Sequence, residues 1–163
     1  MTTNHKTISA PRLWLVLARA YGSIGAYIED SVTAQGLGLS DFMVLEVLLH
    51  KGPLTISAIG EKVLLASASM TSAIDRLEKR ELVRRRSCSS DRRVRIVELT
   101  ACGKTFIAEI YARHEKDLEA VVSGLSEEER RVMYEGLKRV GHAAKTAAAT
   151  TEEKAQLTQD TLA

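Results

Sequence analysis

The chain has 163 residues, of which 45% are hydrophobic and 27% are charged, and its formal net charge is +2. This composition is too apolar for a disordered chain, and the length suits one globular domain with a buried core. Four Tyr, two Phe and one Trp argue against a protein that stacks many single-stranded bases on aromatic rings. No apolar run approaches the roughly 18 residues of a membrane-spanning helix, and no signal peptide is recognisable, so we expect a cytoplasmic protein.

The first third of the chain predicts two helices. Residues 1–9 are polar and without periodicity, and we expect them to form a mobile tail. Apolar residues then recur at helical spacing from Arg12 to about Ala34, after a proline that suits a first turn. Residues 35–39 contain two glycines and predict a loop. A second helix is expected over Asp41–His50, with Ser40 as its N-cap.

The middle of the chain predicts a winged helix-turn-helix. Two short amphipathic helices are expected, from Thr55 to about Val63 and from Ser67 to about Arg80, with the Thr55 hydroxyl as a cap. Two β runs follow, Val83–Cys88 and Val94–Leu99. The predicted fold class is therefore mainly α with a small β-hairpin wing, a layout that places one helix in a DNA groove.

The hairpin region is strongly basic. Between Arg76 and Arg95 there are nine Lys or Arg and three acidic residues, an excess of six positive charges in a chain whose total is +2. A basic face on a protein of low net charge is typical of phosphate contact, although such a face can also be an ordinary solvated surface. The preceding helix pair favours the first interpretation.

The last third of the chain predicts two long helices and a tail. Thr100 is expected to cap a helix that runs to about Gly124. Ser126 and Glu129 form a capping box for a helix to about Thr146, and residues 149–163 are expected to form a second mobile tail. The apolar faces over residues 10–34 and 100–146 exceed what a small winged domain needs, which predicts a homodimer through these helices.

The sequence contains no pattern that predicts catalysis. There is no Gly-rich phosphate loop, no HExxH and no nucleophile elbow, so we expect no enzyme activity and no cofactor. The four His are scattered without ligand spacing, so we expect no metal site. Cys88 and Cys102 are predicted on either side of the hairpin, beyond the roughly 7 Å that a disulfide can bridge, although either could sense redox state or electrophiles.

Three segments in order resemble the MarR family of bacterial transcription regulators. They are SASMTSAIDRLE (Ser67–Glu78), DRR (Asp91–Arg93) and VELTACG (Val97–Gly103), and the resemblance covers roughly residues 10 to 148 of a single domain. It implies a winged region over about 40–99, and a dimeric regulator that binds a pseudo-palindromic site in double-stranded DNA. The expected function is a repressor released by a small aromatic or phenolic ligand or an electrophile. The alternative is a winged protein-interaction module without DNA binding.

The resemblance also assigns the DNA-contacting residues. The second helix of the pair corresponds to the recognition helix, whose small hydroxyls permit close approach to phosphates and base edges. The Asp-x-Arg pattern of the wing implies that Arg93 enters the minor groove and that Asp91 orients it. The candidate DNA-binding residues are Thr55, Ser67, Ser69, Thr71, Ser72, Arg76, Arg86, Ser89, Asp91, Arg92, Arg93 and Arg95.

Two further features qualify the resemblance. Family members usually carry Gly where this chain has Glu81, so this residue must accept a left-handed conformation or the helix must end differently. The runs Ile59–Thr71 and Arg86–Val94 look most like the branch that responds to quinones and related aromatics. The candidate ligand-binding residues that this implies, each of which could also be simple core, are Trp14, Arg19, Tyr21, Phe42 and Leu45.

Overall fold

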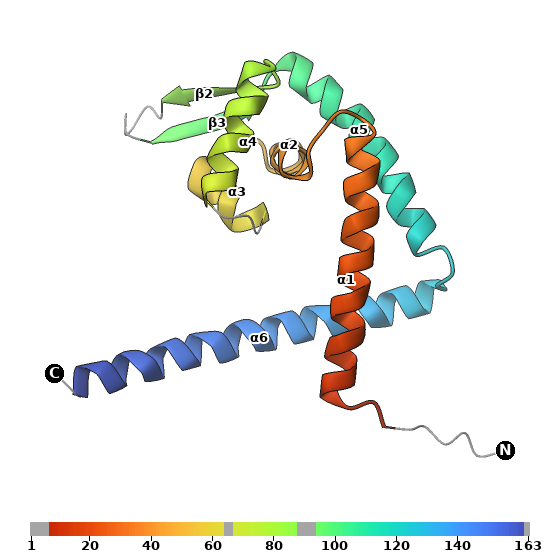
Figure 1. Ribbon diagram of the computed structural model, residues 1–163, viewed down its shortest axis with the longest axis vertical. Coiled ribbons are helices and arrows are strands. Elements are labelled where there is room, and N and C mark those ends of the chain that lie inside the picture. The colour runs from red at the N-terminus through yellow and green to blue at the C-terminus, as the bar shows by residue number, and fades with distance from the viewer. Residues whose placement is uncertain (1–6, 64–66, 88–93, 162–163) are drawn as a thin grey trace. The chain divides into compact units, whose positions relative to one another are not determined.

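The computed structural model describes the backbone of residues 7–63, 67–87 and 94–161, and nothing is described of the side chains of residues 67–69 and 151–161. The elements, shown in Figure 1, are α1 (Ala10–Thr33), α2 (Leu39–Lys51), β1 (Leu54–Thr55), α3 (Ile56–Val63), α4 (Ser67–Lys79), β2 (Val83–Ser87), β3 (Arg95–Leu99), α5 (Ala101–Val121) and α6 (Glu127–Thr161). The predicted fold class is confirmed. The chain divides into two compact units, one up to Glu119 and one from Ala120 onwards.

The first unit is built around α2. Its side chains Phe42, Val44, Leu45 and Leu48 are buried, and they pack in one apolar cluster with residues from every neighbouring element. From α4 the cluster takes Met70, Ala73, Ile74 and Leu77, from the sheet Val83 and Val97, and from α5 Ile107 and Ile110. Burial of apolar surface stabilises this arrangement by about 25 cal/mol per Å². The apolar face of α4 is thereby fixed against the core, and the opposite face is left to solvent.

The start of α2 differs from the prediction. Gly38, with φ −75° and ψ 153°, is the N-cap, so Ser40 lies inside the first turn and is not the cap. No side chain caps this helix. The N-cap residue is a glycine, which has no side chain to act as a cap, and the Ser40 hydroxyl accepts a hydrogen bond from Arg76 Nη2 at 3.1 Å.

The wing is a three-stranded antiparallel sheet in the order β1-β3-β2. The predicted hairpin is confirmed, with Val83 opposite Leu99 and Ser87 opposite Arg95. β1 was not predicted, because two residues give no alternation to recognise. Thr55 belongs to β1, and its Oγ1 also accepts a hydrogen bond from the backbone N–H of Ala58 at 3.2 Å, which confirms its role as a cap.

The turn from α4 to β2 is a left-handed helix end. Glu81 has a φ of +58°, so it accepts the conformation for which glycine is usual. The Leu82 N–H donates to the Leu77 carbonyl and the Glu81 N–H to the Glu78 carbonyl, which is the Schellman pattern. Leu77 and Leu82 are both buried. Their burial and the two hydrogen bonds hold Glu81 in place despite a steric cost of about 1–2 kcal/mol.

The start of α5 is packed against the same turn. Thr100 Oγ1 accepts from the Gly103 N–H at 2.9 Å, which confirms the predicted cap, and the Thr100 N–H donates to the Leu82 carbonyl at 3.1 Å. A Cβ on Gly103 would lie 1.9 Å from the Leu82 carbonyl oxygen. Only glycine therefore fits at this position, and one carbonyl joins the end of α4 to the start of α5.

The second unit contains the last two residues of α5 and all of α6. The capping box is confirmed, since Glu129 Oε2 accepts from the Ser126 N–H at 2.8 Å and Ser126 Oγ accepts from the Glu129 N–H at 3.3 Å. The predicted end at about Thr146 is wrong, because α6 continues to Thr161. The added segment has neither glycine nor proline after Gly141 and is rich in alanine. Its helical propensity is high even though it lacks the apolar stripe that the prediction required.

Candidate nucleic-acid interface

The exposed face of α4 carries polar side chains at helical spacing. Thr71, Ser72, Asp75, Arg76 and Lys79 are exposed, whereas Met70, Ala73, Ile74 and Leu77 on the other face are buried. Thr71 and Ser72 thus lie where the sequence predicted them to be available to DNA. The side chains of Ser67 and Ser69 are outside the described residues, so their part in the interface stays a prediction.

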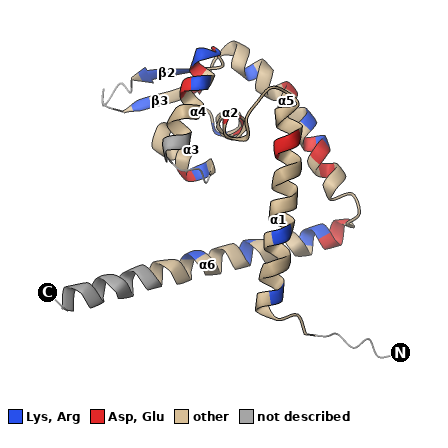
Figure 2. Cartoon of the chain, in the orientation of Figure 1, with Lys and Arg blue, Asp and Glu red and all other residues tan. Residues whose placement is uncertain are grey.

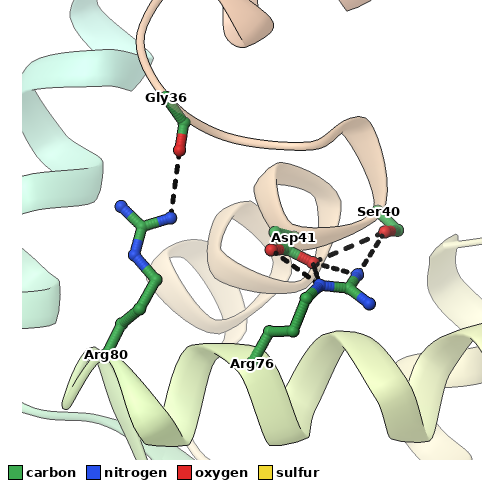
Figure 3. A network of polar contacts seen from close by, with 5 residues as sticks. All are labelled: Gly36, Ser40, Asp41, Arg76 and Arg80. Carbon is green, nitrogen blue, oxygen red and sulfur yellow. Dashed lines mark hydrogen bonds and ion pairs between the residues drawn. The ribbon is translucent and has the colours of Figure 1, made fainter.

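Arg76, a predicted DNA contact, is held by the start of α2 (Figure 3). Its Nη2 lies 2.5 Å from Asp41 Oδ1, and its Nε lies 3.2 and 3.3 Å from the two Asp41 oxygens. Asp41 is only 4% exposed. A buried carboxylate needs a paired cation, so neutralising Asp41 is a structural task of Arg76. The hydrogen bond from Arg76 to Asp41 raises the pKa of Arg76.

Arg80 makes a second link from α4 to the loop before α2. Its Nη1 donates to the Gly36 carbonyl at 3.0 Å, and its guanidinium carbon lies 5.4 Å from the centre of the Phe106 ring. Arg80, just after α4, and Arg76, one turn earlier, reach the loop before α2 and the first turn of α2 respectively, as Figure 3 shows. These two cations therefore fix the orientation of the candidate recognition helix. The sequence did not reveal this, because the partners are 35 to 44 residues away.

Arg85 connects β2 to the exposed face of α4. Its Nη2 donates to Asp75 Oδ1 at 2.6 Å, its Nη1 pairs with Glu78, and its backbone N–H donates to Glu78 Oε1 at 3.0 Å. Burial opposes the charge, but the two carboxylates outweigh it and raise the pKa of Arg85. Arg85 is thus committed to holding the wing against α4.

Arg84 and Arg86 project from the other face of the hairpin. Glu98 binds both, with Oε1 2.7 Å from Arg84 Nε and Oε2 3.1 Å from Arg86 Nε. Hydrogen bonds from Arg84 and then Arg86 lower the pKa of Glu98. The two arginines are 70% and 49% exposed and the Glu98 side chain is 15% exposed, so a phosphate can reach the arginines and compete with Glu98 for them. Arg95, the first residue of β3, donates to Ser87 Oγ at 2.7 Å.

The pairing reduces the positive charge that the sequence predicted for this region. Asp41, Asp75 and Glu98 all lie outside the Arg76–Arg95 segment, and each binds an arginine inside it. Figure 2 shows acidic residues among the basic ones on α4, while the described part of the hairpin is mainly basic. The excess of six charges in the segment is therefore partly neutralised near α4 and better preserved along the hairpin.

The predicted contacts of the wing tip fall in a segment outside the described residues. Cys88, Ser89, Asp91, Arg92 and Arg93 lie outside the described residues, so their DNA contacts stay predictions. Cys102 is described, and it is an exposed free thiol in the first turn of α5.

The candidate ligand residues are not brought together within the chain. Phe42 and Leu45 are buried in the core, whereas Trp14, Arg19 and Tyr21 are exposed on α1. Sequence reasoning did not connect Phe42 with His114, whose ring centre lies 4.8 Å away. His114 is buried, and within the described residues its Nδ1 has no hydrogen-bond partner.

The described residues contain neither a metal site nor a membrane-spanning helix. No group of three or more His, Cys, Asp or Glu there is arranged to hold a metal ion. In the same residues, no helix has the length and apolarity needed to cross a membrane.

The fold and the sequence both have close counterparts among known proteins. The model of the MarR family matches residues 37–94. The transcriptional regulator MhqR of Bacillus subtilis is 41% identical over 134 residues, covering 82% of this chain and 92% of the relative. The uncharacterised regulator YkoM of the same organism is 32% identical over 132 residues, covering 81% of this chain and 86% of the relative.

Solved structures of lower identity share the fold. AbsC, a MarR family regulator from Streptomyces coelicolor, superposes with a TM-score of 0.74 at 20% identity, covering 86% of this chain and 99% of that one. BpsR of Bordetella bronchiseptica gives 0.72 at 24% identity, covering 80% and 98%. The named relatives are regulators and not enzymes, as the sequence predicted. The chain belongs to the MarR family and is a winged helix-turn-helix, DNA-binding transcriptional regulator.

Proposed function

We propose that the protein is a homodimeric repressor in the cytoplasm that binds a pseudo-palindromic operator and is released by a small aromatic or phenolic ligand or an electrophile. The observation that carries DNA binding is the exposed polar face of α4 beside the arginines of the hairpin. A helix with small polar residues suits the major groove, and Arg84 and Arg86 supply cations for phosphates.

Exposed apolar side chains support the dimer. On α1 they include Leu13, Trp14, Val16 and Tyr21, and on α6 they include Val132, Met133, Leu137 and Val140. Exposed apolar side chains gathered along a helix are typical of a surface that another chain covers. A second copy related by two-fold symmetry would cover the same surfaces on both chains.

The effector class rests first on the sequence, whose runs Ile59–Thr71 and Arg86–Val94 resemble the branch that responds to quinones and related aromatics. MhqR, at 41% identity, is likewise a transcriptional regulator. BpsR is described as regulated in its DNA binding by 6-hydroxynicotinic acid, which is an aromatic compound, but that likeness extends to the fold alone. An electrophile could also act on the exposed thiol of Cys102.

Footprinting on the DNA upstream of the protein's own gene tests this function. We expect protection of two related half-sites about one helical turn apart, on the order of 34 Å, because the two recognition helices of a dimer reach successive major grooves. An added simple phenol or quinone should release the protein. Protection no stronger than on a scrambled duplex would contradict DNA recognition, and protection unaffected by phenols or quinones would contradict the effector class.

A further inference from the structure

Asp75 lies in the middle of the exposed face of the candidate recognition helix. Thr71, Asp75 and Lys79 are four residues apart and Ser72 is three residues before Asp75, so these side chains share one face of α4. All four are exposed. The inference below rests on the proposed function, in which this face enters the major groove.

The charge of Asp75 is unsuited to phosphate contact. A carboxylate is repelled by the backbone of DNA, and the next residue, Arg76, does not compensate for it because it is turned to Asp41. The floor of the major groove is different, because cytosine presents its N4 amino group there and adenine its N6 amino group. A carboxylate at the centre of the face therefore matches base edges and not phosphates.

The structure also holds this carboxylate in a defined orientation. Arg85 Nη2 binds Asp75 Oδ1 at 2.6 Å, and Arg85 is itself fixed by Glu78 through its side chain and its backbone N–H. The Asp75 side chain is still 51% exposed. Among the described residues no donor binds Asp75 Oδ2, so one oxygen is free to accept a hydrogen bond.

We propose that Asp75 is a specificity-determining residue that accepts a hydrogen bond from the N4 amino group of a cytosine in each half-site. Cytosine is favoured over adenine because the N7 of adenine is an acceptor next to its amino group and repels a carboxylate. Guanine and thymine present only acceptors at this edge, apart from the thymine methyl group. In this contact Asp75 reads a base in the major groove, and Arg85 of β2 holds its carboxylate in position.

Binding-site selection with the full-length dimer tests the proposal. Duplexes selected from a randomised pool by the unaltered protein give its preferred site, and each base pair is then replaced in turn. We expect one C·G pair per half-site whose replacement by T·A weakens binding by roughly 5- to 150-fold, the range for one lost base contact. Asp75→Ala should lose discrimination at this pair alone. Asp75→Asn should prefer A·T there, because asparagine pairs with N6 and N7 of adenine.

Glu78→Gln is the matched control, because Glu78 shares Arg85 with Asp75 but binds it through both side chain and backbone. This variant should weaken binding to all duplexes by a similar factor and leave the base preference unchanged. If the two Asp75 variants do the same, with circular dichroism showing intact folds, Asp75 only braces the wing and the proposal is wrong. If the unaltered protein selects no site at all, the proposed function fails instead.

Discussion

Glu81 is held in the left-handed region at φ +58°, where a side chain beyond Cα costs about 1–2 kcal/mol. Glycine would remove this cost. It would also give the unfolded chain more conformational freedom, which cancels about 0.5–1 kcal/mol of the stabilisation. We expect Glu81→Gly to raise the free energy of unfolding by up to about 1 kcal/mol in urea denaturation. Glu81→Ala keeps the Cβ and should give no gain, so an equal gain from both would show that the strain is not in the backbone.

Arg76 and Asp41 differ in exposure, so removing one or the other should lower the free energy of unfolding by different amounts. The Arg76 side chain is 51% exposed and that of Asp41 is 6% exposed. Arg76→Ala leaves a buried carboxylate without its cation, which we expect to cost about 3 kcal/mol. Asp41→Asn leaves a half-exposed guanidinium that water can solvate, so about 1 kcal/mol is expected.

A double variant tests whether the loss from Arg76→Ala comes from the unpaired Asp41 carboxylate. Asp41→Asn combined with Arg76→Ala removes both charges, so its free energy of unfolding should exceed that of Arg76→Ala alone. Urea denaturation of the four proteins without DNA measures the coupling. Additive losses would mean that the two side chains do not stabilise the fold as a pair.

At the scale of elements, the sequence predicted the helices and the hairpin well. The apolar period of α1 and α4, the two short β runs around a polar tip, and the caps at Thr55, Thr100 and Ser126 are all local signals, and local signals can be recognised in a sequence. β1 was missed because its two residues pair with β3, some 40 positions away along the chain. The end of α6 was missed because propensity, and not an apolar stripe, maintains its last turns.

The candidate site was only partly predictable for the same physical reason. Exposure of Thr71 and Ser72 follows from the helical period. The pairing of Arg76 with Asp41, and of Arg85 with Asp75 and Glu78, depends on how α4 packs on α2 and β2, which no local pattern encodes. Charge counting therefore overestimated the free cations near α4.

The close contact between Gly103 of α5 and Leu82, after α4, can be tested by substitution. Gly103→Ala would place a methyl group 1.9 Å from the Leu82 carbonyl oxygen, so the backbone of α5 or of the turn must shift. We expect a loss of about 2 kcal/mol or more, in the range for overpacking against the backbone. Thermal unfolding followed by circular dichroism measures it. Gly60→Ala is the control, because no atom lies within 4 Å of the added methyl, and it should be neutral or stabilising.

For the whole molecule, the proposed dimer predicts a concentration-dependent mass. Leu137 is an exposed apolar side chain of α6, and a charge at this position would be buried without a partner in the dimer. Leu137→Asp should therefore sediment as a monomer at micromolar concentration, where we expect the unaltered protein to be a dimer. His142→Asp introduces the same charge at another exposed position of α6 and should leave the dimer intact.

DNA binding by the whole molecule should depend strongly on salt. Each phosphate neutralised contributes about 0.9 to the slope of log K against log salt, and a dimer contacts several phosphates per subunit. Arg86→Ala should reduce this slope if Arg86 leaves Glu98 for a phosphate, whereas a slope identical to that of the unaltered protein would place Arg86 outside the contact. Fluorescence anisotropy of a labelled duplex at several salt concentrations measures both.

The Leu82 carbonyl accepts hydrogen bonds from the Thr100 N–H and hydroxyl, and Gly103 closes over it. These contacts make the junction between α4 and α5 rigid. Because of these contacts, we expect a rotation of α5 to move the end of α4 with it. A change in the orientation of α5 should therefore change the angle at which α4 meets DNA, through the contacts of the Leu82 carbonyl.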